Sequence, residues 1–372
     1  MEQKNSVEYI RKKIRQNFQA HRNNQRFQEN DSFRLGLGEI KSLVEEIENL
    51  TEKDVHGLCV RIKRKKHADS NDLFRLSQAF LQSIENITMF AKTPGALQII
   101  VKELTGHDSE QQIRAAETLC NLSLGDETVC EKIATQAGSY LITFLESVDF
   151  RLKQSSLWTL INIVSTGKKG AEILMSMEII SKCSDILYSE NMSENVDLLN
   201  DIALCLNLTL KSEIFNPTTV DLGRVFENIT KIPLEDERNE FVMEVIFNSH
   251  IIKSSYTFNI EQLKYIAQVT VKNILSSSHF SKMLYHVRVL ANVTFIYKDT
   301  FVLILEDVCL NVNTSFANLL NHLFSFDDES FTKEVLWLLK NIIYVTNNDT
   351  KTNNLISDLK IPMRISNTFI NS

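Results

Sequence analysis

The residues of this chain that could carry out chemistry are its cysteines and histidines, and their spacing matches no common catalytic or metal-binding motif. The six cysteines contain no C-x-x-C pair, and no two of the eight histidines form an H-E-x-x-H pattern. Neither a glycine-rich phosphate loop nor a Gly-x-Ser-x-Gly elbow occurs. Glu235, Asp236 and Glu237 follow Pro233, which is typical of a solvated turn. The sequence therefore predicts packed thiols and no catalytic site, metal or cofactor.

The composition favours an all-α fold. The chain has 372 residues and is 43% hydrophobic, but contains only ten glycines and four prolines. So few turn-forming residues argue against a β-rich fold and favour long helices joined by short polar loops. No signal pattern and no apolar run of about 18 residues occurs, so the sequence predicts a protein of the cytosol and nucleus without membrane contact.

The charge is divided unevenly along the chain. The net charge is −7, yet residues 1–66 carry a surplus of +5 and the remaining residues sum to −12. An acidic body attracts basic partners and repels nucleic acid. We therefore expect protein ligands, with a basic peptide favoured over nucleic acid.

A short apolar segment containing an asparagine recurs along the chain. The steps between successive asparagines are 35, 41, 45, 41, 44 and 49 residues. The asparagines are Asn86, Asn121, Asn162, Asn207, Asn248, Asn292 and Asn341. A period near 42 residues is typical of stacked helical repeats, because each repeat has an apolar stripe that only its neighbours can bury. The sequence therefore predicts an α-solenoid of about seven repeats over residues 73–372.

The repeat pattern resembles the armadillo family. The stretch GALQIIVKELTGHDSEQQIRAAETLCNLSLGDE is similar to the armadillo consensus, and Trp158 with Asn162 and Trp337 with Asn341 resemble the Trp-x-x-x-Asn pairs of importin-alpha proteins. The segment GSYLITFLESVDFRLKQSSLWTLINIV is similar to a divergent importin-alpha subfamily named for transmembrane and coiled-coil domains. The resemblance implies a right-handed armadillo-type solenoid.

The resemblance also implies a cargo-binding groove. In that family the asparagine amide bonds the backbone of an extended peptide, and the tryptophan rings hold Lys or Arg side chains. Transferred to this sequence, the expected cargo-binding residues are Asn121, Trp158, Asn162, Asn207, Trp337 and Asn341. Glu117 and Ala203 stand where further tryptophans would be expected, which predicts weaker binding. The alternative for each pair is a tryptophan packed in the core.

The N-terminal 30 residues form a basic arm that resembles the importin-beta-binding segment of importin-alpha. Its cations are Arg11, Lys12, Lys13, Arg15, Arg22 and Arg26. A dense Lys-Arg-Arg cluster is absent, since Asn24, Gln25 and Arg26 stand where it would lie. A solvated tail remains the alternative to an importin-beta site.

Residues 31–72 are predicted to hold a capping helix followed by a basic linker. Ile40, Leu43, Val44, Ile47 and Leu50 follow a helical spacing in an acidic stretch. A basic cluster comes next, with Arg61, Lys63, Arg64, Lys65 and Lys66. That cluster is either a nuclear localisation signal, a mimic of cargo, or a solvated charged segment.

Three classes of function remain from the sequence. The first is a non-enzymatic nuclear-import adaptor that binds basic cargo and importin-beta. The second is a general armadillo scaffold for other protein partners. An enzyme is the third, and no residue pattern supports it.

Overall fold

The computed structural model describes residues 49–189, 196–211, 222–236, 239–250, 256–277, 280–346 and 358–359, and within these ranges it contains helices and no strands. The described helices divide into two compact units, and each is described by itself. No helix in the described part of the chain is both long enough and apolar enough to cross a membrane.

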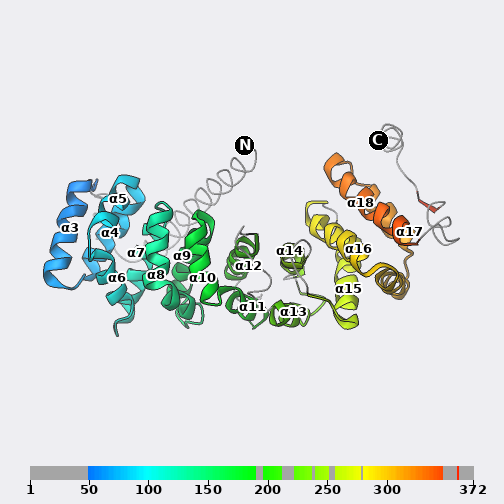
Figure 1. Ribbon diagram of the computed structural model, residues 1–372, viewed down its shortest axis with the longest axis horizontal. Helices are drawn as coiled ribbons and strands as arrows, with labels where there is room; N and C mark the ends of the chain where they lie inside the picture. The colour runs from blue at the N-terminus through cyan, green and yellow to red at the C-terminus, as the bar shows by residue number, and fades with distance from the viewer. Residues whose placement is uncertain are drawn as a thin grey trace, which may run out of the picture. The chain divides into compact units, whose positions relative to one another are not determined.

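The helices of unit 1 are stacked side by side (Figure 1). They are α3 (Glu52–Lys65), α4 (Ser70–Gln82), α5 (Ile84–Lys92), α6 (Ala96–Leu104), α7 (Ser109–Leu122), α8 (Glu127–Phe144), α9 (Phe150–Thr166) and α10 (Lys168–Ser176). The long helix α7 packs between α4 and α9, while the shorter α6 packs on α7. The sequence α5, α6, α7 therefore forms a three-helix repeat that ends in a long helix, as in an armadillo-type solenoid.

Unit 2 follows the same plan. Its helices are α11 (Ile179–Ser189), α12 (Val196–Lys211), α13 (Leu222–Ile229), α14 (Asn239–His250), α15 (Ile260–Ser276), α16 (Phe280–Asn311), α17 (Phe316–Phe324) and α18 (Glu329–Thr346). Helix α14 packs between α12 and α16, and α16 packs against α15 and α18. Helix α16 is two helices joined at Lys298, whose φ of 48° and ψ of −132° break the helical path. Its second part, α17 and α18 form another three-helix repeat.

Side-chain caps set where the long helices begin. The carboxylate of Asp108 accepts from the backbone N–H groups of Glu110 and Gln111 at the start of α7. Asp149 caps α9 in the same way, through the N–H of Leu152. Such caps satisfy backbone donors that a helix leaves unpaired at its first turn. The short loops with aspartate therefore fix the register of the long helices.

Two sequence predictions need correction in this region. Asn86 lies in the first turns of α5 and not in a helix that ends a repeat, and its amide donates to Leu50 O and Ala79 O at 2.8 and 3.0 Å. Helix α4 instead takes the place of the long helix in the first repeat, because it packs on α7. Residues 61–65, expected to form a basic linker, are the last turns of α3, which packs on α4, α5 and α6. The solenoid therefore begins at α3, before residue 73.

The expected basic arm of residues 1–30 lies outside the described residues. The expected capping helix spans residues 37–58, and its part before residue 49 also lies outside them. Residues 49–51 are not helical, and the rest of that stretch belongs to α3.

Candidate functional site

The predicted cargo-binding asparagines all lie in long helices that end a repeat. Asn121 is in α7, Asn162 in α9, Asn207 in α12 and Asn341 in α18. All four are buried, with exposed fractions between 3% and 6%. Their side chains therefore face a neighbouring helix and offer little surface to a ligand.

The amide NH₂ groups are used inside the protein. Asn121 Nδ2 donates to the carbonyl and the hydroxyl of Ser77 in α4, at 3.1 and 2.7 Å. Asn162 Nδ2 donates to Ser123 Oγ at 2.9 Å, and Asn341 Nδ2 donates to Ala291 O in α16 at 2.8 Å. Each amide thus ties its helix to the preceding one. The ladder of peptide-binding amides stays a prediction, and the acceptors described for Asn121, Asn162 and Asn341 all lie within the protein.

The asparagine bonds lead to a stability prediction. Replacing Asn162 with alanine leaves the buried hydroxyl of Ser123 without its donor, so the free energy of unfolding should fall by about 1 to 3 kcal/mol. Asn292→Ala is the matched control, because that half-buried amide donates to Arg288 O of its own helix, and we expect a loss of about 0.5 kcal/mol. Urea unfolding followed by circular dichroism measures both. Equal losses in the two variants would contradict the proposed role of the amide.

The two tryptophans occupy different environments. The side chain of Trp158 in α9 is buried, with 5% of the residue exposed, whereas Trp337 in α18 is 38% exposed. At the other two positions where a tryptophan was considered, Glu117 pairs with Arg114 at 3.2 Å and Ala203 is buried. Of the two tryptophans that were predicted to bind cargo, Trp337 is therefore the one exposed at the surface.

Trp337 belongs to a face formed by α16 and α18 in unit 2. The repeat asparagines are Asn292 in α16 and Asn341 in α18. On each helix, the face has side chains seven and four residues before the asparagine and three residues after it. A spacing of three and four residues puts them on one side of each helix. We call this surface the aromatic face, and it consists of Tyr285, Arg288, Phe295, Glu334, Trp337 and Tyr344.

Three aromatic rings of this face are exposed. The exposed fractions are 56% for Phe295, 38% for Trp337 and 68% for Tyr344. The rings of Phe295 and Tyr344 stack across the two helices, with centroids 6.5 Å apart and an angle of 27° between the ring planes. Aromatic rings at the surface offer a large contact area with little loss of side-chain entropy on binding.

Charged groups hold the same face together. Arg288 donates from Nη2 and Nε to Glu334 Oε1 at 2.7 and 2.9 Å, which joins α16 to α18. The guanidinium also lies 5.5 Å from the ring centre of Phe247 and 5.9 Å from that of Tyr285. Tyr285 donates to Glu244 Oε1 of α14 at 2.8 Å. The cation of Arg288 is thus neutralised by Glu334, and the carboxylate of Glu244 accepts from Tyr285 beside it.

The described residues show no arrangement suited to metal binding. Among them, no group of three or more His, Cys, Asp or Glu side chains could hold a metal ion. All six cysteines are buried and unbridged, as predicted for packed thiols. Burial raises the pKa of Cys59 and of Cys309 to about 11, which makes these thiols poor nucleophiles.

Sequence reasoning named Trp337 and Asn341 but missed the rest of the aromatic face. Phe295 and Tyr344 both stand three residues after a repeat asparagine, and Arg288 and Trp337 both stand four before one. Comparing the same offsets in every repeat would have found them. Asn207 and Ala203 in α12 also lie in unit 2, but both are buried.

The two predicted basic segments have different outcomes. Arg11, Lys12, Lys13, Arg15, Arg22 and Arg26 lie outside the described residues. The cluster of residues 61–66 is helical up to residue 65, and Arg61 and Lys65 pair with Asp69 and Asp72 of the next helix segment. An extended localisation signal would require α3 to unfold, so the folded charged segment is the better interpretation.

Comparisons with known proteins agree with the fold. No protein-family model and no curated protein matches the chain in sequence. Among solved structures, an engineered protein from a structural genomics consortium matches with a TM-score of 0.61 and 19% identity, covering 83% of this chain and 72% of that one. A designed armadillo repeat protein in complex with the peptide (KR)4 has a TM-score of 0.40 and 17% identity, covering 73% and 92%.

A third solved structure is one of a set of computationally designed armadillo repeat proteins for modular peptide recognition. Its TM-score is 0.40 and its identity 15%, covering 77% of this chain and 99% of that one. The helices and their packing, with the first of these likenesses, define the chain as an all-α solenoid of armadillo type. The importin-alpha relationship remains a prediction from the sequence.

Proposed function

We propose that this protein is a non-enzymatic scaffold that binds an extended segment of a partner protein on the aromatic face. The observation that carries the proposal is the exposure of Phe295, Trp337 and Tyr344 together on two adjacent helices. Exposed aromatic clusters on soluble proteins mark interaction sites, because their burial in an interface is favourable and a few such residues supply most of the binding energy. The neighbours designed for peptide recognition are consistent with this use of the fold.

We further propose that the bound segment contains Lys or Arg. The open faces of Trp337 and Tyr344 attract cations by about 0.5 to 2 kcal/mol each. The carboxylates of Glu244 and Glu334 lie on or beside the same face, where Tyr285 donates to Glu244 and Arg288 pairs with Glu334. A basic segment with aliphatic side chains therefore complements the surface better than an acidic one.

The more specific proposal is nuclear import, with basic cargo on the solenoid and importin-beta on the N-terminal arm, acting in the cytosol and nucleus. It is supported by the resemblance of the Trp337 and Asn341 pair and by the composition of the arm, including Arg11 and Lys12. The burial of Trp158 and Asn162 favours the more general alternative, a scaffold for other partners, because these two side chains offer little surface to a ligand.

A double substitution tests the proposed face. Trp337→Ala with Tyr344→Ala removes two of its three exposed rings and should weaken binding of a labelled basic peptide of about ten residues by about tenfold or more. Fluorescence anisotropy with the full-length protein measures the dissociation constant. A second peptide with glutamine in place of Lys and Arg separates a basic ligand from a general extended one.

The matched control is Leu310→Ala. Leu310 is 69% exposed in the second part of α16, so its truncation removes exposed apolar surface elsewhere in unit 2. We expect the dissociation constant of this variant to change less than about twofold. The proposal fails if the double variant binds the peptide as tightly as the unchanged protein, or if the control weakens binding equally.

A further inference from the structure

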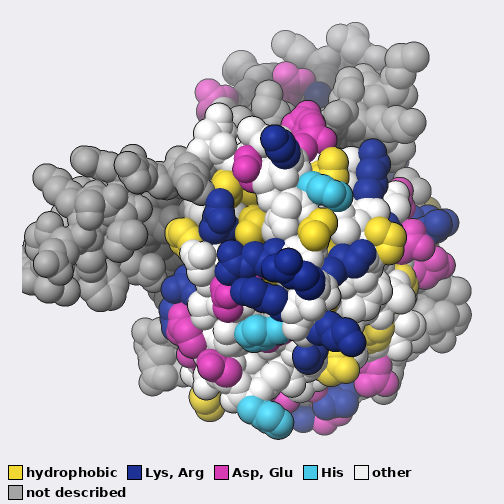
Figure 2. Space-filling view, turned by 90° about the vertical axis from the view of Figure 1, so that its left-hand side faces the viewer, with side chains coloured by type: hydrophobic (Ala, Val, Ile, Leu, Met, Phe, Trp, Pro, Cys, Tyr) yellow, Lys and Arg dark blue, Asp and Glu magenta, His cyan; other side chains and the backbone are white. Residues whose placement is uncertain are grey.

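Cations gather at the α3 end of unit 1. Figure 2 shows Lys and Arg side chains clustered on this surface. The exposed cations are Lys53, Lys63, Arg64, Lys65 and Lys66 in and just after α3, with Lys92 at the end of α5. The chain as a whole has a net charge of −7, so this local excess runs against the overall balance.

Part of this charge is used to hold the fold. Arg61 pairs with Asp69 at 3.2 Å and with Asp72 at 3.1 Å, and Lys65 pairs with Asp69 at 3.1 Å. These bonds connect α3 to the start of α4. By contrast, Lys63, Arg64, Lys66 and Lys92 form no ion pair with any carboxylate of the described residues. We call these four side chains the open cations.

Two of the open cations, Lys63 and Lys92, line a hollow between α3 and α5. The hollow has a volume of about 410 Å³ and is lined by His56, Val60 and Lys63 of α3 and by Met89 and Lys92 of α5, with Thr93 and Pro94. Val60 is 54% exposed although it is aliphatic. An apolar floor between two lysines suits a ligand that is both apolar and negatively charged.

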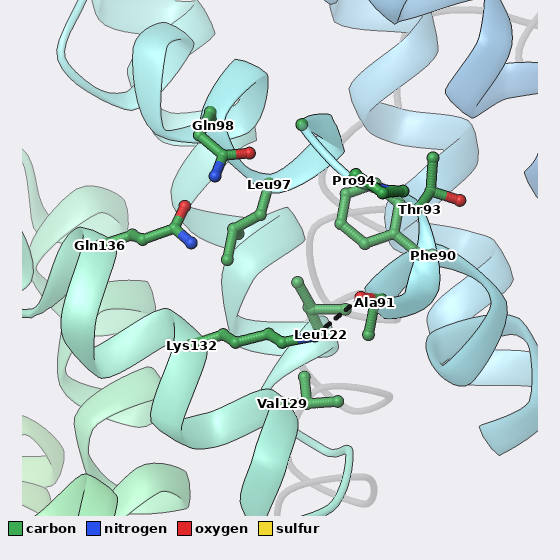
Figure 3. A pocket seen from close by; sticks show the side chains of 11 residues that line it. Phe90, Ala91, Thr93, Pro94, Leu97, Gln98, Leu122, Val129, Lys132 and Gln136 are labelled. Carbon is green, nitrogen blue, oxygen red and sulfur yellow. Dashed lines mark hydrogen bonds between the residues drawn. The ribbon is translucent and has the colours of Figure 1, made fainter.

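A second hollow of about 140 Å³ lies across the same turn, since Thr93 and Pro94 line both. Phe90, Leu97 and Val129 form apolar walls, and the amides of Gln98 and Gln136 face each other across it (Figure 3). Gln136 Oε1 is buried without a hydrogen-bond donor among the described residues. Lys132 donates to Ala91 O at 3.0 Å, which keeps its ammonium at the rim. The space fits one small side chain of a partner.

We propose that this surface, named here the α3 docking surface, binds an acidic segment of a partner protein that carries an aliphatic side chain. The carboxylates would pair with Lys63, Arg64 and Lys92, and the aliphatic group would enter a hollow. A protein segment fits better than nucleic acid, because the larger hollow is mostly apolar and the open cations are only four. The ligand proposed for the α3 docking surface is acidic, whereas the ligand proposed for the aromatic face is basic. The two proposals are therefore independent.

Charge reversal tests the docking surface in the full-length protein. The probe is a labelled peptide of about twelve residues, rich in Asp and Glu with two central leucines, and its dissociation constant is measured by fluorescence anisotropy. We expect Lys63→Glu with Lys92→Glu to raise that constant about tenfold or more, since two contacts become repulsive. Val60→Asp should also weaken binding, because it places a like charge on the apolar floor.

The control variant carries the same change in charge at another site. Lys168→Glu with Lys169→Glu alters two exposed lysines of α10, which packs on α8 and α9 and not on α3, and should change the dissociation constant less than about twofold. An unchanged affinity in the Lys63 and Lys92 variant, or an equal loss in the control, would overturn the proposal. The proposal is also overturned if no peptide binding is measurable at about 1 mM. The same holds if a single-stranded DNA of about twelve nucleotides binds more tightly than the peptide and this binding depends on Lys63.

Discussion

Trp158→Ala should lower the free energy of unfolding by about 3 to 5 kcal/mol, whereas Trp337→Ala should lower it by about 1 kcal/mol or less. The reason is the difference in burial, because Trp158 is 5% exposed in α9 and Trp337 is 38% exposed in α18. Truncating a buried indole leaves a cavity, while truncating an exposed one mainly removes surface. Urea unfolding followed by circular dichroism measures both losses.

Trp158→Phe is the control for this comparison. It retains a large aromatic side chain, so we expect it to cost clearly less than Trp158→Ala. The family resemblance predicts instead that Trp158 and Asn162 can be truncated without unfolding the chain. If Trp158→Ala is no less stable than Trp337→Ala, then Trp158 is a surface residue and the assignment of the site to unit 2 is wrong.

Stability should fall with acidity because of His286, which lies in α16 with 1% of its surface exposed. Neither ring nitrogen has a hydrogen-bond partner among the described residues, and desolvation lowers the pKa of the imidazole from 6.5 to about 4. The folded protein therefore keeps His286 neutral while the unfolded chain takes up a proton below about pH 6.5. The resulting loss in the free energy of unfolding grows as the pH falls from about 6.5 to 4, and it should reach about 2 kcal/mol at about pH 5.

The variant His286→Leu isolates this effect. It removes the titrating group and keeps an apolar side chain of similar size, so its stability should depend less on pH than that of the unchanged protein. The difference in unfolding free energy between the two proteins should grow by about 2 kcal/mol between about pH 7.5 and pH 5. Other titrating groups occur in both proteins and cancel. A difference that is the same at both values would show that the imidazole is not desolvated.

Much of the fold could be predicted from the sequence, because helical periodicity and a repeat near 42 residues leave few alternatives to a solenoid. The register of the first repeat was wrong. Asn86 has the same local pattern as Asn121, but it lies in α5, and the helix that packs on α7 is α4. A single sequence shows which helix face an asparagine occupies and does not show which neighbour covers it.

The same limit explains the outcome for the candidate site. Trp158 with Asn162 and Trp337 with Asn341 have identical spacing, yet only Trp337 is substantially exposed. Burial depends on the packing of the next helix in the stack, which no local pattern encodes. The partners of Trp337 on the aromatic face, Phe295 and Tyr344, become evident only when α16 and α18 lie side by side.

The most direct test of the account is the fluorescence of Trp337 during peptide binding. In a Trp158→Phe variant, Trp337 is the only indole, since the chain has two tryptophans. Titration with the basic peptide should shift its emission to the blue and protect it from iodide quenching, with the same midpoint as the anisotropy signal of the labelled peptide. If the peptide binds by anisotropy while the emission and the quenching of Trp337 stay unchanged, the aromatic face is not the binding site.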